Sequence, residues 1–124
     1  MISNNSNTGI GYQALMRTQG NFNTALGREA GEYVDGNNNV LLGYQAGSAA
    51  TTITRSGSVM IGYQAGYGST GNNKIFIENS SAGANNALIY GEFDNNILRT
   101  NSEFQIGNPS GTGYAFPTTD GSNG

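Results

Sequence analysis

The sequence predicts an all-β fold, a parallel β-solenoid of about five coils followed by a small β-hairpin region. Three observations support this prediction: a short motif recurs, an apolar triplet precedes each copy, and turn-forming residues separate the copies. The glycine of the motif falls at positions 11, 27, 43 and 62, so the period is 16, 16 and then 19 residues. Self-similarity at a short and nearly fixed period is typical of a solenoid.

The repeat is clearest in its third copy, where Val-Leu-Leu at 40–42 precedes Gly-Tyr-Gln-Ala-Gly at 43–47. Short apolar runs bounded by Gly and Asn are typical of β-strands. After a polar lead-in at 1–7, we therefore expect one strand per coil. The five triplets lie at 8–10, 24–26, 40–42, 59–61 and 75–77.

The two faces of each triplet differ in composition. Side chains alternate along a strand, so the first and third members share one face and the middle member takes the other. The first and third members are β-branched or aliphatic, and we expect them to fill the coil. This predicted coil core consists of Ile10, Leu26, Val40, Leu42, Val59, Ile61, Ile75 and Ile77.

The middle member of the triplet is apolar in every coil and grows along the chain. An apolar stripe running the length of a rod requires a partner. We therefore expect this stripe to face outward, toward other copies of the chain around a symmetry axis that widens towards the C-terminus. The pattern alone does not distinguish two copies from three. The stripe consists of Gly9, Ala25, Leu41, Met60 and Phe76.

Polar side chains recur directly before the triplets, and stacking would place them above one another. Such ladders of amides satisfy one another along the axis of a stacked structure. The predicted ladder contains Asn7, Asn23, Asn39, Ser58 and Asn73. The three additional residues of the long period lie within 48–56, where we expect a protruding loop.

Tyrosines recur in register at positions 12, 44 and 63. They could form a sugar-binding stripe, because aromatic rings suit amphipathic ligands. We favour a stacked tyrosine ladder, because repeated positions usually serve the contacts between neighbouring repeats. In the second coil Arg28 and Glu29 replace Tyr and Gln, and we interpret them as a solvated pair.

The period is lost after about residue 79, which divides the chain into a β-roll at 1–79 and a C-terminal β region with a linker to further modules at 80–124. Residues 88–93 are typical of a strand and 94–96 of a turn. We expect 97–100 and 103–107 to pair as a hairpin through Asn101 and Ser102.

The composition of the 124 residues excludes several classes of function. A net charge of −3 with five scattered basic residues argues against nucleic acid binding. There is no Cys or His, and nothing pairs the carboxylates as a glycosidase would require. At 94–96 a turn is favoured over a calcium site. No run reaches the ~20 apolar residues of a membrane helix. We expect no enzyme activity, catalytic residue, metal or cofactor.

Two copies, Asn-Thr-Ala-Leu-Gly at 23–27 and Ser-Val-Met-Ile-Gly at 58–62, resemble the Ser-Val-Ala-Ile-Gly head repeats of trimeric autotransporter adhesins. With Gly-Tyr-Gln-Ala-Gly at 43–47 and 62–66, they are also similar to repeats of phage tail fibres and related bacterial surface proteins. Residues 72–80, 88–93 and 114–121 fit the same pattern.

This resemblance implies a left-handed β-roll, an intertwined homotrimer, and further fibre modules at both ends. It also implies attachment to a host glycan or protein receptor, outside the cell on a virion or cell surface. Two alternatives remain: a carbohydrate-binding adhesin module in its own right, and a virion-associated spike that degrades glycans. The surface that could face a receptor includes Thr52, Ile53, Arg55 and Tyr67.

Overall fold

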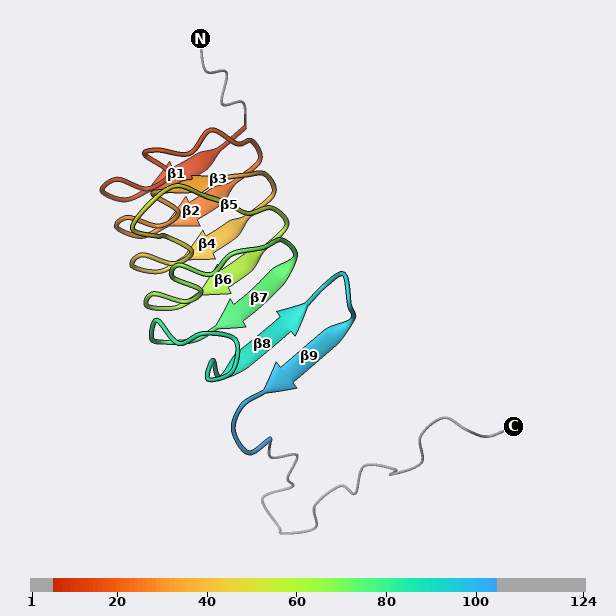
Figure 1. Cartoon of the computed structure of the whole chain (residues 1–124). Coiled ribbons are helices and arrows are strands. Elements are labelled where there is room, and N and C mark those ends of the chain that lie inside the picture. Colours follow the sequence, from red (N-terminus) through yellow and green to blue (C-terminus); the bar gives the residue numbers. More distant parts are fainter. Residues whose placement is uncertain (1–5, 105–124) are drawn as a thin grey trace.

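The computed structural model describes residues 6–104, and within this range it contains β-strands and no helix. The chain forms a β-solenoid of about 4 turns, whose coils stack along one axis (Figure 1). All five predicted triplets form strands, so the predicted five coils correspond to five rungs joined by these turns. The rungs are β1 (Thr8–Ile10), β2 (Thr24–Leu26), β4 (Val40–Leu42), β6 (Val59–Ile61) and β7 (Lys74–Ile77).

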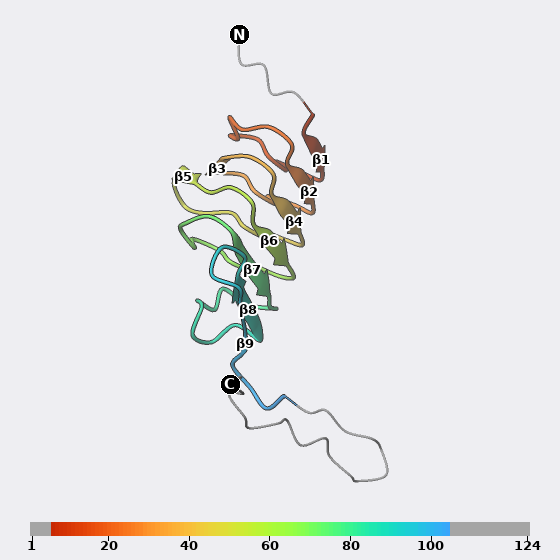
Figure 2. The ribbon, with the colours of Figure 1, turned by 90° about the vertical axis from the view of Figure 1, so that its right-hand side faces the viewer.

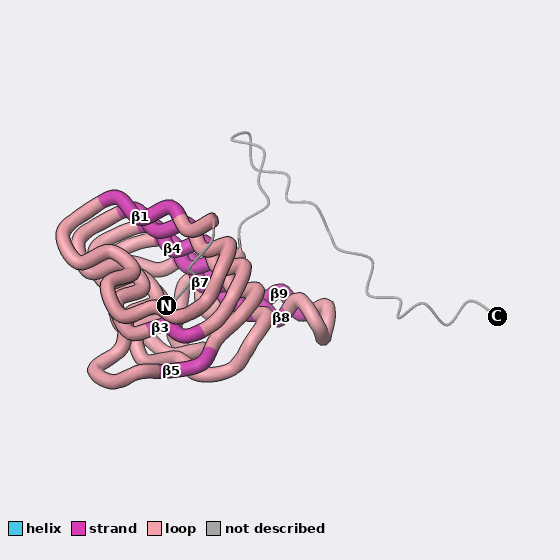
Figure 3. Tube along the Cα trace, turned by 90° about the horizontal axis from the view of Figure 1, so that it is seen from above, coloured by secondary structure: helices cyan, strands magenta, loops and turns pink. Residues whose placement is uncertain are grey.

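The rungs pair in parallel, with like positions of the repeat beside one another. Leu41 lies between Ala25 and Met60, and Met60 lies between Leu41 and Phe76. A second, shorter sheet pairs β3 (Val34–Asp35) with β5 (Ile53–Thr54), also in parallel. Figure 3 shows this pair on the side of the coils opposite the long sheet. The three additional residues of the long coil lie before β5. They therefore change neither the register of β3 with β5 nor that of β4 with β6.

The long sheet continues beyond the solenoid. β8 (Ile89–Glu92) pairs antiparallel with β7, and β9 (Ile97–Thr100) pairs antiparallel with β8, which gives the order β1-β2-β4-β6-β7-β8-β9. Figure 2 shows the successive strands along one side of the stack. The predicted strand at 88–93 and turn at 94–96 are confirmed, whereas the predicted pairing of 97–100 with 103–107 lies mostly outside the described residues, of which 103–104 form no strand. β9 pairs with β8, and 105–107 lie outside the described residues, as do 114–121.

The predicted assignment of the two strand faces is reversed. The middle residues of the triplets point into the coil, where Ala25, Leu41, Met60 and Phe76 are buried in one cluster. The first and third residues point outward, and Ile10, Leu26 and Val40 are exposed. The others of the predicted core are partly buried: Leu42, Val59, Ile61, Ile75 and Ile77.

The reversal has a steric cause in the opposite wall of each coil. A Cβ at Gly47 would lie 2.5 Å from Cδ2 of Leu41, and one at Gly66 would collide with the sulfur of Met60. In the first coil the large and small residues exchange places. Leu15 occupies the position of these glycines and faces Gly9, which occupies the position of Leu41 and Met60. Large residues therefore face glycine and glycine faces a large residue, as close packing requires.

A polar ladder runs beside the apolar core, as the sequence predicts. The backbone N–H of Asn23 donates to Oδ1 of Asn7, and that of Asn39 donates to Oδ1 of Asn23. Ser58 continues the series by donating its N–H to Asn39. The last rung differs from the prediction: Lys74, and not Asn73, donates its N–H to Ser58. The ladder satisfies polar groups that burial would otherwise leave unpaired.

The glycine that ends each triplet is required by close approach of the coils. At Gly27 φ is 133°, in a region that L side chains rarely adopt. A Cβ there would also lie 2.5 Å from the carbonyl oxygen of Gly43 in the next coil. The recurring glycine is therefore one of the points at which the backbones of successive coils approach too closely for a side chain.

Candidate functional site

The outward residues of the seven-stranded sheet form one continuous surface, which we call the outer face. The register carries it across the hairpin, since Ile75 pairs with Gly91 and Gly91 pairs with Leu98. None of its members is charged. The outer face consists of Thr8, Ile10, Thr24, Leu26, Val40, Leu42, Val59, Ile61, Ile75, Ile77, Ile89, Gly91, Leu98 and Thr100.

The outer face is apolar and open to solvent. Ile10 is 60% exposed, Leu26 50% and Leu98 75%. At about 4.8 Å between strands and about 3.3 Å per residue, the surface is roughly 30 Å long and about 10 Å wide. This is about 300 Å², within the range of about 300–600 Å² for the largest apolar patch on a typical monomer, and such patches are often functional. The outer face is therefore the part of the molecule best suited to contact another protein surface.

A hollow interrupts the outer face at its C-terminal end. Gly91 is buried between Ile75 and Leu98 and leaves no room for a side chain, since a Cβ there would lie 2.7 Å from Cγ2 of Ile75 and 2.6 Å from the oxygen of Ile97. An open cavity of about 330 Å³ lies beside it. It is lined by Ile75, Glu92, Phe93, Asn96, Ile97 and Leu98.

A column of planar side chains stands at the corner after the triplets. The rings of Tyr44 and Tyr63 stack with centroids 5.3 Å apart and planes 20° apart, which confirms this step of the tyrosine ladder. Arg28 extends the column, with its guanidinium 5.6 Å from the centroid of Tyr12 and 5.8 Å from that of Tyr44. A planar cation between two rings is favourable. Tyr44 contacts Arg28 and stacks on Tyr63, whereas Tyr12 and Tyr63 at the ends of the column stay exposed.

The neighbouring position forms a second column. Gln64 donates its side-chain N–H to Gln45, and Gln45 donates to Glu29 at 2.7 Å in both cases. Glu29 also accepts a hydrogen bond from Arg28 at 2.8 Å, which raises the pKa of Arg28. Arg28 and Glu29, which replace Tyr and Gln in the second coil, therefore continue the two columns: Arg28 the column of rings and Glu29 the column of amides. The sequence alone suggested only a solvated surface pair.

Of the four residues expected to face a receptor, Arg55 is placed differently. It is fully buried, and the prediction of a receptor-facing role for it is wrong. Its guanidinium donates to the carbonyl of Gly47 at 2.6 Å and of Gly66 at 3.2 Å. Burial lowers the pKa of Arg55 to about 10. Of the remaining three, Thr52 is exposed, while Ile53 and Tyr67 are partly buried.

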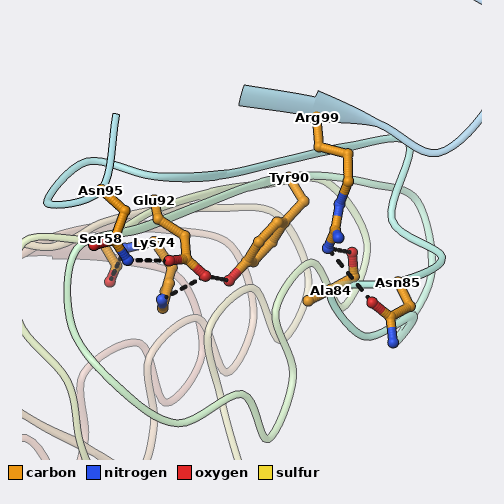
Figure 4. A network of polar contacts seen from close by, with 8 residues as sticks. All are labelled: Ser58, Lys74, Ala84, Asn85, Tyr90, Glu92, Asn95 and Arg99. Carbon is orange, nitrogen blue, oxygen red and sulfur yellow. Dashed lines mark hydrogen bonds and ion pairs between the residues drawn. The ribbon is translucent and has the colours of Figure 1, made fainter. Parts of the chain in front are cut away.

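The hairpin is attached to the last coil by a polar cluster (Figure 4). Lys74 forms an ion pair of 2.9 Å with Glu92, which also accepts hydrogen bonds from the Tyr90 hydroxyl and from Asn95. Hydrogen bonds from Tyr90, then Asn95 and Lys74, lower the pKa of Glu92 to about 2. Arg99 lies 5.0 Å from the centroid of the Tyr90 ring. This cluster was not predicted from the sequence.

The acidic residues of the described chain are mostly separate from one another. No group of three or more His, Cys, Asp or Glu in residues 6–104 is arranged to hold a metal ion. Three of the carboxylates, Glu29, Glu32 and Glu92, are each paired with a cation. Among the described residues, no helix is long and apolar enough to cross a membrane.

Comparisons with protein-family models, with curated proteins and with solved structures find no match to this chain. The fold and the surfaces described above are therefore the basis for assigning a function.

Proposed function

We propose that the chain is a structural segment of a homotrimeric fibre, outside the cell on a virion or cell surface, that contributes to attachment to a host. The resemblance of the repeats supports the count of three, the left-handed roll and the location. The uncharged outer face is the single observation on which the proposal depends. It offers a long apolar surface for contact between copies.

The stacked coils suit the role of a rod. Each coil is joined to the next by strand pairing, by the Asn ladder and by the stacked corner side chains, so neighbouring coils hold one another in register. In such repeat structures stability is the sum of local and nearest-neighbour terms. Packing of the outer faces of three copies around one axis would add a further contribution to this stability, from contacts along the whole length of the rod.

This proposal changes the axis predicted from the sequence. The middle residues of the triplets are buried inside each coil. In this proposal, the outward residues therefore make the contact between copies. Such a contact is made of aliphatic side chains and threonines, which removes apolar area from water at no cost in buried charge. Trimerisation and stability should then be coupled, with stability rising with concentration.

The mass of the chain in solution tests the proposal. One chain has a mass of 12.9 kDa, and light scattering at micromolar concentration should report three times this value. The midpoint of thermal unfolding should rise as the protein concentration increases, because folding and association are linked. A stable monomer with a concentration-independent midpoint would contradict the fibre assignment.

A further inference from the structure

Tyr44 and Tyr63 form the one pair of tyrosines in ring contact within residues 6–104. Stacking with ring centroids 5.3 Å apart is favourable in itself. A phenol also loses a hydrogen atom to one-electron oxidants and becomes a radical, whose unpaired electron is spread onto the ring carbons ortho to the oxygen. Two phenols held face to face therefore form a candidate site for oxidative coupling.

The backbone holds the two tyrosines in place from both sides. The N–H of Gly62, which precedes Tyr63, donates to the carbonyl of Leu42 at 2.8 Å. The N–H of Gln64, which follows Tyr63, donates to the carbonyl of Tyr44 at 2.8 Å. Fixing two reacting groups in this way replaces a chance encounter by a reaction within one molecule.

An oxidant can reach this pair from solvent, because Tyr63 is 48% exposed and Tyr44 is partly buried. The third tyrosine of the column, Tyr12, is 66% exposed, but Arg28 lies between it and Tyr44. A guanidinium cannot couple to a phenol, and within residues 6–104 no tyrosine ring contacts Tyr12. The column thus contains one pair placed for coupling and one exposed tyrosine that is not.

A covalent link at this place would join β4 to β6, the third and fourth rungs of the stack. The coil between them is the one lengthened by three residues, and it contains the buried Arg55. The chain has no cysteine, so the disulfides that commonly stabilise secreted proteins cannot form within it. A link between two rungs restricts the unfolded chain, as a disulfide does.

We propose that Tyr44 and Tyr63 are a site of oxidative cross-linking, at which a peroxidase with hydrogen peroxide couples the two rings into dityrosine. Each phenol gives up one electron and one proton, and a bond then forms between two ring carbons ortho to the oxygens. The hydrogen on each of these carbons moves to the oxygen of its own ring, which restores both phenols. The two electrons and two protons reduce one hydrogen peroxide to two waters. The cross-link does not depend on the number of copies in the fibre.

Oxidation of the full chain by a peroxidase and hydrogen peroxide, at dilute protein concentration, tests the site. Tryptic cleavage after denaturation places Tyr44 in peptide 29–55 and Tyr63 in peptide 56–74. Mass spectrometry should find these two peptides joined with the loss of two hydrogen atoms, and fragmentation should locate the bond on the two tyrosines. Tyr63→Phe keeps a ring in the column but forms no phenoxyl radical, so it should lower the yield of joined peptides at least tenfold.

Tyr12→Phe is the matched control. It removes the hydroxyl of an exposed tyrosine in the same column and should leave the yield of joined peptides unchanged.

Three results would overturn the cross-linking site: no joined peptides from the wild type, an unchanged yield from Tyr63→Phe, or coupling only between separate chains. Intact mass under denaturing conditions identifies the last result, because a link within one chain keeps the mass of a single chain. The mass of the unoxidised protein in solution is measured separately. A trimer without the link would contradict this site alone, and a monomer with the link would contradict the fibre function alone.

Discussion

The surroundings of Arg55 are unusual for a charged residue. Its side chain is fully buried without a carboxylate, its Nε has no hydrogen-bond partner within residues 6–104, and its charge is compensated only by carbonyl dipoles and the sulfur of Met60. A buried charge without a counter-ion is costly. The arginine is tolerated because its terminal nitrogens satisfy the carbonyls of Gly47 and Gly66.

Substitutions at Arg55 should separate the volume of the side chain from its charge. Arg55→Ala leaves a cavity and two carbonyls without donors, so we expect a loss of about 2–5 kcal/mol in the free energy of unfolding. Arg55→Met keeps most of the volume and removes the buried charge, so it should cost less. Denaturant unfolding of both variants measures the difference. An alanine variant as stable as the wild type would contradict the burial of this side chain.

At the residue scale, the sizes of residues along each coil indicate which face of a triplet is interior. Alternation along each triplet separates two faces correctly but does not say which one is inside. The deciding signal lies six residues further on, where Leu15 follows Gly9 while Gly47 follows Leu41. Complementary sizes at this spacing identify the middle residue as interior. The burial of Arg55 had no such signal, because it depends on how the inserted residues fold back.

The hairpin formed by β8 and β9 closes one end of the stack through the cluster around Glu92. Because Glu92 has a pKa of about 2 in the folded chain against an ordinary value of 4.5, its interactions stabilise the fold above pH 4.5. That contribution is lost as the pH falls from 4.5 through 2. The attachment of the hairpin should therefore weaken in acid.

Glu92→Gln tests this dependence. The midpoint of thermal unfolding of the wild type should fall between pH 4.5 and 2, and Glu92→Gln should show a flatter profile in the same window. Asp94→Asn changes the charge equally, two residues away and without a hydrogen bond in the cluster, and should follow the wild type. Profiles that coincide for Glu92→Gln and the wild type would show that Glu92 does not carry the acid sensitivity.

Among the elements, local patterns were sufficient for the strands and insufficient for one pairing. Four of the five triplets lie between Asn or Ser and Gly, and the fifth, at 75–77, is entirely aliphatic and aromatic; both patterns are typical of strands. The pairing of β9 with β8 was not predicted, because the turn signal at Asn101 and Ser102 directed attention to the other edge of β9. The contact of Phe76 with Tyr90, at 5.1 Å between ring centroids, favours β8 by continuing the core beyond β7.

The whole molecule has an interior too thin to hide more than one apolar face of each strand. Within residues 6–104 the other face stays at least partly in contact with water along most of the sheet, and association between copies would remove it from water. The sequence predicted an exposed apolar stripe on the middle residues of the triplets, but these residues are buried in the coil, and the exposed apolar residues are the outward ones.

A pair of neighbouring aspartate substitutions tests the assignment of faces most directly. Met60 and Ile61 are adjacent in β6 and point to opposite sides of the sheet. Light scattering and circular dichroism of both variants should show that Ile61→Asp yields a folded monomer, whereas Met60→Asp unfolds the coil. A folded monomer from Met60→Asp, together with an unchanged trimer from Ile61→Asp, would contradict the account.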